Sequence, residues 1–351
     1  RLARSRDRAH VPGHQGRPGD RALAEAWGPG VWQWDLTELA GLDNLAAPSG
    51  PIAAAQAEAA AAVGAAETWF LVNGSTGGIL AAILATVGDG ETILMARNVH
   101  QSAIAALILS GAQPVWLPVP IEPDWAMAGP IEPTTIAAAL AQHPKAKAVF
   151  VVSPTYYGLT SDLAAIADLA HGHGLPLIVD GAHGAHFGRH PGLPAHAIAA
   201  GADLVIESTH KTLGGLTQAA MLHRAPEALG PASDRLRAAL RWVQSSSPSY
   251  LLLASLDGAR RSAADPGFWQ RPIDLAQSAR DRLGALAGVR VLNQPGQDPL
   301  RLTFTVAGRS AYDLDDWLDR DHGLAIELAD SQNLVLVPVS YTHLTLPTNR
   351  E

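Results

Sequence analysis

The residues best able to do chemistry lie together at positions 208–211, where Ser208, Thr209, His210 and Lys211 follow the apolar run 204–206. Such a run predicts a strand buried on both faces, and reactive groups gather at strand ends in α/β sheets. A partly buried lysine there loses its proton more readily and can form a Schiff base with a carbonyl cofactor. An isolated lysine at a strand end is more often a plain surface residue, so other positions must support this interpretation.

A second candidate site follows the predicted strand 68–72, in the segment Asn73-Gly74-Ser75-Thr76-Gly77-Gly78. Strand, glycine-rich loop and helix in this order predict a phosphate site, because the N–H groups of a helix N-terminus lie beside two hydroxyl donors. The segment lacks the third glycine of a dinucleotide fingerprint and the Gly-Lys pair of a nucleoside-triphosphate loop. Taken alone, Ser75 or Thr76 could equally be an ordinary helix cap.

Asp180 and His100 each come just after a predicted strand. An aspartate that ends the apolar run 175–179 is costly to bury unless a cation or a strong donor pairs with it, which indicates a functional partner. The imidazole of His100 could stack on a flat ring, or it could cap the helix that follows. His183 and His186 raise the question of a metal site, but there is no helical His-Glu-x-x-His pattern and no cysteine, so we expect none.

Six predicted strands, most of them followed by a helix, position these residues. The pattern predicts an α/β fold with three layers, in which a mostly parallel sheet lies between helices and its strands end at one edge. The expected strands cover residues 68–72, 92–95, 114–118, 148–152, 175–179 and 204–206. The groups at this edge fit pyridoxal phosphate, with the phosphate at the helix N-terminus, the pyridine nitrogen at the aspartate and the aldehyde at the lysine.

Several segments resemble the Orn/Lys/Arg decarboxylase family of fold-type I pyridoxal-phosphate enzymes. They are His10-Val11-Pro12-Gly13-His14, residues 73–77, residues 180–186 and Ser208-Thr209-His210-Lys211-Thr212-Leu213. Further matches at 247–251, 254–257 and 323–328 extend the resemblance over residues 10–339. The Ser-Thr-His-Lys motif is highly specific.

The resemblance implies a role for each candidate residue. Lys211 would bind the cofactor covalently, Asp180 would keep its pyridine nitrogen protonated, and His183 or Lys211 would return a proton to the substrate. The other cofactor contacts would come from His100 and Ala182 on the two ring faces, and from Gly74, Ser75, Thr76, Ser208 and His210 around the phosphate. Thr155, which lies in a polar cluster after the strand 148–152, and His183 are the candidates for substrate binding.

The resemblance also implies a reaction, the decarboxylation of arginine, lysine or ornithine to an amine of the polyamine pathway and carbon dioxide. The residues leave alternatives open, because one fold can support several chemistries. One is another fold-type I enzyme, such as an aminotransferase or an aldolase. The other is a non-catalytic partner subunit that keeps the fold. The sequence does not say which basic amino acid is the substrate.

The composition limits the possible partners. With 47% hydrophobic and 17% charged residues, the chain should bury much of its surface, part of it in a homodimer or larger homo-oligomer with active sites near the subunit interface. A net charge of -8 argues against nucleic acid and anionic membranes as partners. No apolar run reaches the roughly 18 residues of a membrane-spanning helix. We expect a small-molecule amino acid substrate and a cytoplasmic location.

The 351 residues predict about two domains. We expect an N-terminal segment at 1–30, a large cofactor-binding domain at 31–265 and a small α+β domain at 266–339, divided at the break Ala264-Asp265-Pro266-Gly267. Residues 340–351 match nothing upstream and resemble a translated sequencing adapter. They are therefore predicted to be non-native, and the small domain to be truncated.

Overall fold

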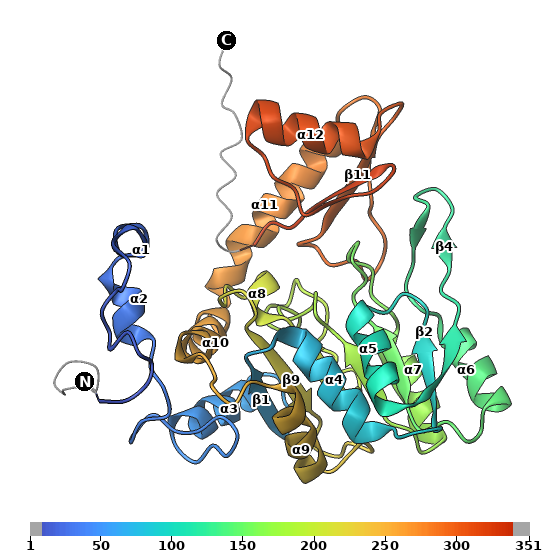
Figure 1. Ribbon diagram of the computed structural model, residues 1–351. Helices are drawn as coiled ribbons and strands as arrows, with labels where there is room; N and C mark the ends of the chain where they lie inside the picture. The colour runs from blue at the N-terminus through green and yellow to red at the C-terminus, as the bar shows by residue number, and fades with distance from the viewer. Residues whose placement is uncertain (1–8, 340–351) are drawn as a thin grey trace.

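A seven-stranded sheet forms the centre of the protein, whose computed structural model describes residues 9–339 (Figure 1). The strand order is β1-β9-β8-β7-β6-β2-β3, and every neighbouring pair is parallel except the two that include β9. The predicted α/β fold with a mostly parallel sheet is confirmed. The strands are β1 (Glu67–Leu71), β2 (Thr92–Ala96), β3 (Gln113–Leu117), β6 (Val149–Val152), β7 (Leu177–Asp180), β8 (Leu204–Glu207) and β9 (Ala220–Arg224).

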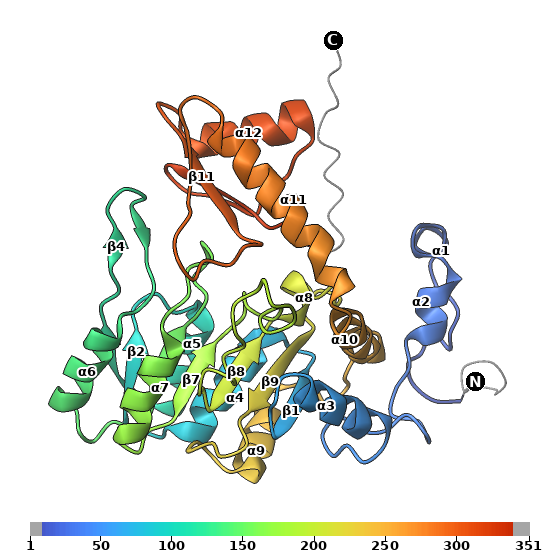
Figure 2. The same ribbon diagram turned by 180° about the vertical axis from the view of Figure 1, so that it is seen from behind.

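Helices cover both faces of this sheet and give the three predicted layers (Figure 2). Successive residues of a strand point to opposite faces, so Ile93 of β2 packs with one set of helices and Leu94 with the other. The first set is α4 (Gly74–Thr86), α5 (Gln101–Ser110) and α9 (Ser233–Val243); the second includes α6 (Pro133–Gln142) and α7 (Leu163–Gly172). At the β1 end, α3 (Pro51–Ala61) and α10 (Tyr250–Ala263) complete the second layer.

Strand β9 is the one strand of this sheet that the sequence analysis does not predict. It runs antiparallel between β1 and β8, where Met221 lies opposite Phe70 and Leu222 lies opposite Ile206. Because β9 is antiparallel to both of its neighbours, β1 and β8 run in the same direction. The carboxyl end of β1 therefore still lies at the same edge as those of the other strands.

The C-terminal part is a four-stranded antiparallel sheet packed on two helices, and it lies above the carboxyl edge of the large sheet in Figure 1. Trp269 is fully buried and donates its indole N–H to the carbonyl of Ala263 at 3.0 Å, which ties this part to the large one. The elements are α11 (Gly267–Gly284), β10 (Val289–Val291), β11 (Leu302–Val306), α12 (Ala311–His322), β12 (Leu328–Ala329) and β13 (Asn333–Leu336). The domain boundaries at 30 and 265 stay predictions.

Two short helices near the N-terminus, α1 (Arg21–Trp27) and α2 (Pro29–Trp34), stand away from the body of the protein (Figure 1). Neither helix contains a buried residue, and Trp27 and Trp34 are 56% and 57% exposed. A small hairpin of β4 (Ile121–Glu122) and β5 (Met127–Ala128) projects from the opposite side.

Two remaining expectations concern the ends of the chain and a membrane. The predicted non-native tail at 340–351 lies outside the described residues, as do residues 1–8. Within residues 9–339, no helix combines the length and the apolar composition needed to cross a bilayer.

Candidate active site

A cavity of about 360 Å³ lies where the carboxyl ends of β1, β2, β7 and β8 meet. Parallel strands present their carboxyl ends to one edge, so residues far apart in the sequence come together there. Six of the predicted site residues line this cavity: Ser75, His100, Asp180, Ala182, His183 and Lys211. The structure therefore brings together predicted site residues that follow or end β1, β2, β7 and β8.

Lys211 lies on a one-turn helix, α8 (Thr209–Thr212), which begins almost directly after β8. Its Nζ is 2.9 Å from His183 Nε2. The residue is exposed to the cavity, yet partial burial lowers the pKa of its amine and outweighs the charge of Asp180, which raises that pKa. The side chain is thus biased toward the neutral amine, the form that attacks a carbonyl group.

Asp180 is the last residue of β7, and its side chain is buried. Its Oδ1 accepts a hydrogen bond from the backbone N–H of Ala182 at 3.1 Å. Burial raises the pKa of the carboxyl group, while this hydrogen bond and the charges of Lys211 and His100 lower it, and the raised value prevails. A buried carboxylate at a cavity wall favours a cationic partner, since a partner offsets the cost of burying the charge.

His100 caps a helix and lines the cavity at the same time. Its Nδ1 accepts the backbone N–H of Ser102 at 3.2 Å, so the imidazole is the N-cap of α5. The ring nevertheless stays exposed at the cavity wall. The sequence analysis treats capping and ring stacking as alternatives, but here the cap orients the ring without burying it.

The predicted glycine-rich loop forms the first turn of α4, because this helix begins at Gly74. Gly74 has a φ of +70°, a conformation that favours glycine. The backbone N–H groups of the turn are those of a helix N-terminus, which attract anions. Ser208 Oγ donates to Ser75 Oγ at 2.9 Å, so hydroxyl groups from two distant segments meet at this end of the cavity.

The other predicted cofactor residues, Gly74, Thr76, Ser208 and His210, are not among those that line the cavity. Ser208 reaches it through its hydrogen bond to Ser75. Thr76 is exposed in the first turn of α4. His210 Nδ1–H donates to the carbonyl of Ala219 at 2.9 Å, so this nitrogen is already paired with the backbone. Their proposed role in holding an anion rests on their place around the α4 N-terminus.

Thr155, predicted to bind substrate, does not line the cavity. Its side chain is buried, and its Oγ1 accepts the backbone N–H of Leu159 at 3.1 Å. The hydroxyl group therefore closes the turn that follows β6. The next residue, Tyr156, lines the cavity.

The sequence analysis misses three polar residues near the cavity. Asn98 lines it, and within residues 9–339 its buried Oδ1 has no hydrogen-bond partner. Tyr156 donates its hydroxyl to Glu327 Oε1 at 2.5 Å, and burial together with this carboxylate raises the pKa of Tyr156 to about 12. Asn98 could have been found from its place two residues before His100. Glu327 lies in the matched segment 323–328, but its contact with Tyr156 spans 171 residues and could not be read from the sequence.

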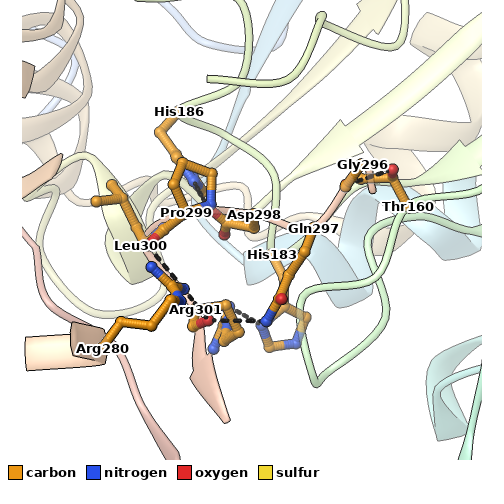
Figure 3. A network of polar contacts seen from close by, with 10 residues as sticks. All are labelled: Thr160, His183, His186, Arg280, Gly296, Gln297, Asp298, Pro299, Leu300 and Arg301. Carbon is orange, nitrogen blue, oxygen red and sulfur yellow. Dashed lines mark hydrogen bonds and ion pairs between the residues drawn. The ribbon is translucent and has the colours of Figure 1, made fainter. Parts of the chain in front are cut away.

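His183 lies between the cavity lysine and an arginine from the C-terminal part. Its Nδ1 accepts a hydrogen bond from Arg301 at 3.1 Å (Figure 3). Its Nε2 lies 2.9 Å from Lys211 Nζ. Burial lowers the pKa of His183 well below 6.5, and the charges of Arg301 and Lys211 lower it further. His183 is therefore a neutral imidazole, and Arg301 is a fourth residue that the sequence analysis misses.

Among the described residues, one group of side chains has the composition of a metal site: His196, Glu207 and His223. All three are buried, and both imidazole Nε2 atoms lie within hydrogen-bond distance of Glu207, at 2.7 and 3.2 Å. His196 Nδ1 accepts the N–H of Ile198, so its Nε2 carries the hydrogen and donates it to Glu207. Together with the contact between Thr68 and His223, these contacts form a buried hydrogen-bond network.

Comparison with known proteins gives a consistent result. The model of the family described as Orn/Lys/Arg decarboxylase, major domain, matches residues 3–298. An arginine decarboxylase of Bacillus subtilis is 36% identical over 341 residues, which cover 93% of this chain and 69% of the relative. The solved structure of lysine decarboxylase A from Pseudomonas aeruginosa is similar with a TM-score of 0.83 at 24% identity, over 97% of this chain and 56% of that chain.

A second solved structure, the constitutive lysine decarboxylase of Escherichia coli, has a TM-score of 0.80 at 20% identity. These two structural likenesses show the fold, and the chain spans 56% and 57% of the two lysine decarboxylases. The family model covers most of the chain, and the resemblance of its motifs is confirmed. The chain belongs to the Orn/Lys/Arg decarboxylase family.

Proposed function

We propose that this protein removes the α-carboxyl group of a basic amino acid, releasing carbon dioxide and an amine, with pyridoxal phosphate bound in the cavity. The observation that carries the proposal is the meeting of Lys211, Asp180 and His100 around one cavity. An amine for covalent attachment, a carboxylate for the ring nitrogen and an imidazole for the ring face are what this cofactor needs. Membership of the family supports the same activity.

The residues of the cavity fit the cofactor. The Asp180 carboxylate accepts a backbone N–H at Oδ1 and retains the capacity to accept the N–H of a protonated pyridine. Asn98 Oδ1, which is buried and has no partner among the described residues, offers a further acceptor. Ser75, Ser208 and the N-terminus of α4 would hold the phosphate.

Each residue has a distinct task in the proposed reaction. When bound, the cofactor supplies a positively charged ring that accepts the electron pair left by the departing carboxyl group. Asp180 holds the proton on the pyridine nitrogen and so maintains that charge. Lys211 supplies the amine for attachment. His183, with Nε2 at 2.9 Å from Lys211 Nζ, is placed to exchange a proton with this amine.

An acidic group near the cavity supports a basic side chain on the substrate. Glu327 accepts the hydroxyl hydrogen of Tyr156, which lines the cavity. Burial lowers the pKa of Lys211, and the charge of Glu327 opposes this shift, so the carboxylate acts electrostatically at the site. It would attract the ammonium or guanidinium group of lysine, ornithine or arginine. Arginine is the first substrate to test, because the Bacillus subtilis relative is named an arginine decarboxylase.

We also infer that the protein is a homodimer or a larger homo-oligomer. Trp27 and Trp34, on helices that bury nothing, expose large aromatic surfaces of the kind that a second copy covers. Replacing both by serine should lower the sedimentation coefficient to that of a smaller assembly. An active site near the subunit interface, a cytoplasmic location and a place in polyamine formation stay predictions.

The experiment that tests the proposal uses the three lysines of the sequence, Lys145, Lys147 and Lys211. Borohydride reduction of the protein with pyridoxal phosphate, followed by peptide mass spectrometry, locates the attachment point. We expect the label on Lys211 alone, together with carbon dioxide and amine release from arginine, lysine or ornithine. Lys211→Ala should lose both, whereas Lys147→Ala should keep both, because Lys147 Nζ pairs with Glu91 at the surface at 3.7 Å.

Other outcomes favour the alternatives. Formation of a keto acid without carbon dioxide would indicate an aminotransferase, and cleavage to an aldehyde would indicate an aldolase. A purified protein that neither takes up pyridoxal phosphate nor turns over any of the three amino acids would contradict the proposal and favour a non-catalytic subunit.

A further inference from the structure

A buried guanidinium group lies directly behind His183 and Lys211. Arg301, just before β11, is 1% exposed and donates to His183 Nδ1 at 3.1 Å (Figure 3). Burying a guanidinium group costs free energy that a specific partner must offset. The charges of Asp298 and Glu327 offset part of this cost, whereas within residues 9–339 Arg301 Nε has no hydrogen-bond partner and Nη2 donates to His183. This indicates that the position serves His183.

The surrounding backbone is shaped to let Arg301 reach His183. Gly158 has a φ of +87°, and a Cβ there would lie 2.4 Å from Arg301 Cβ and 2.6 Å from Arg301 Cγ. Arg280 and Gln297 both donate to the backbone carbonyl of Arg301, each at 3.2 Å (Figure 3). Gly158 leaves room for the Arg301 side chain, and the hydrogen bonds from Arg280 and Gln297 fix the Arg301 backbone.

Hydrogen-bond chemistry then assigns the hydrogen of His183. A guanidinium group only donates, so His183 Nδ1 is an acceptor and carries no hydrogen. The neutral imidazole therefore carries its hydrogen on Nε2, which lies 2.9 Å from Lys211 Nζ. An N–H group at this distance needs an acceptor. The neutral amine of Lys211 has a lone pair that can accept it, whereas an ammonium group has none.

We propose that Arg301 is a positioning residue that holds His183 in the tautomer with hydrogen on Nε2, so that His183 donates to the neutral amine of Lys211. The role of the Lys211 amine in binding the cofactor rests on the proposed function, but the assignment of the His183 tautomer does not. The arrangement selects the nucleophilic form of Lys211 before the cofactor is attached. It also leaves a proton donor beside the amine.

The charged groups around His183 favour the same state. Arg301 and Lys211 contact it directly, and His100 and His186 lie within electrostatic range. Burial is the largest cause of the lowered pKa of His183, and the charges of these four groups lower it further. The Tyr156 ring packs on the imidazole with ring centroids 4.6 Å apart and adds no charge in its neutral form. Protonation of Nδ1 would place N–H against N–H.

The charges around Lys211 are divided. Burial lowers its pKa, the charge of Arg301 lowers it too, and the carboxylates of Asp180 and Glu327 raise it. A change at Arg301 therefore acts on Lys211 in two ways, through its charge and through the His183 hydrogen bond. A glutamine at position 301 keeps an N–H donor without the charge, so it separates the two effects.

Nitrogen NMR of the 351-residue chain labelled with 15N-histidine tests the tautomer, with the cofactor removed and His183→Asn used to assign the signal. At neutral pH we expect the hydrogen of wild-type His183 on Nε2. Arg301→Gln should retain this tautomer, and Arg301→Met should lose it. Arg280→Lys is the matched control, because it changes the support of the same segment but leaves the Arg301 guanidinium in place.

Competitive acetylation of the same proteins gives a second readout, with Lys145 and Lys147 as internal references. Arg301→Met should lower the labelling of Lys211 at neutral pH about tenfold, the effect expected from losing a hydrogen bond near a charged group. In Arg301→Gln, the labelling of Lys211 should be much closer to the wild-type level than in Arg301→Met. Arg280→Lys should label like wild type.

A wild-type His183 with its hydrogen on Nδ1 would overturn the proposal. So would an Arg301→Met variant with the wild-type tautomer and wild-type labelling. If Arg301→Met does not fold, the wild-type tautomer and the labelling of Arg301→Gln still decide. Neither readout depends on turnover, so a failure here is distinguishable from a failure of the proposed decarboxylation.

Discussion

Gly78 sets the distance between α4 and the central sheet, so Gly78→Ala should damage both stability and the anion site. A Cβ at this position would lie 2.6 Å from Leu71 Cδ1 and 2.8 Å from Ile206 Cγ2. Carbon atoms in ordinary contact lie about 3.5–4.0 Å apart, so α4 must move outward by roughly 1 Å or both side chains must leave their preferred rotamers. Leu71 and Ile206 are both fully buried and have little room to move.

The magnitude follows from two opposing terms. Overpacking a closed core costs about 1–3 kcal/mol, and alanine in a helix interior gains about 0.5–1 kcal/mol over glycine. We therefore expect the free energy of unfolding to fall by about 1 kcal/mol, within a range of roughly 0–2.5 kcal/mol. The same displacement would stretch the 2.9 Å hydrogen bond from Ser208 to Ser75 beyond its normal range. The affinity for pyridoxal phosphate should then fall about tenfold.

Urea unfolding of the cofactor-free chain and an absorbance titration with pyridoxal phosphate measure these two effects. Gly258→Ala is the matched control, because Gly258 lies in α10 and its Cβ would meet nothing within 4 Å. This variant should be more stable than wild type by about 0.5–1 kcal/mol. A Gly78→Ala protein as stable as the control, or one that binds the cofactor as tightly as wild type, would refute the reasoning.

Three further predictions follow from the described contacts. Burial raises the pKa of Asp180, so the ionised carboxylate destabilises the cofactor-free fold at a pH above 3.8, the ordinary pKa of an aspartate. The Asp180→Asn variant should therefore unfold at a higher urea concentration than wild type at neutral pH, while losing turnover. Burial raises the pKa of Glu207, but the imidazoles of His196 and His223 lower it more. The ionised carboxylate therefore stabilises the fold above pH 4.5, and this stabilisation is lost as the pH falls below 4.5. In an acid titration followed by circular dichroism, Glu207→Gln should remove the loss of stability that Glu207 causes. Gly158→Ala should destabilise the chain by more than Gly174→Ala, as judged by urea midpoints, because both have a positive φ but a Cβ at Gly174 would meet nothing within 4 Å.

The strand ends and most cavity residues could be predicted because their signal is local. Lys211 and Asp180 each lie at the end of a buried apolar run, and an α/β pattern brings such ends to one edge. Strand β9 escaped prediction because its short apolar run is followed within the strand by His223 and Arg224. The sequence does not reveal that His223 is buried, since this depends on its contact with Glu207 across the sheet.

Residues that act through long-range contacts could not be predicted. Arg301 meets His183 across 118 residues, and nothing near it in the sequence marks it as part of the site. Thr155 and Tyr156 are neighbours of similar polarity, and the turn closed by the hydrogen bond to Leu159 decides which of them faces the cavity. Periodicity describes strands and helices, but it does not describe how a turn orients each side chain.

The position of β1 at the sheet edge has a consequence for synthesis on the ribosome. β1 pairs with β9, and Thr68 meets His223 across 155 residues. At about 5–20 residues per second, the partner strand emerges roughly 8–30 seconds after β1. During this interval the apolar Trp69, Phe70 and Leu71 have no strand beside them, and an unpaired strand is prone to aggregate. The nascent chain therefore cannot fix β1 and the N-terminus of α4 that follows it until β9 has emerged, and its folding yield depends on how long β1 is shielded.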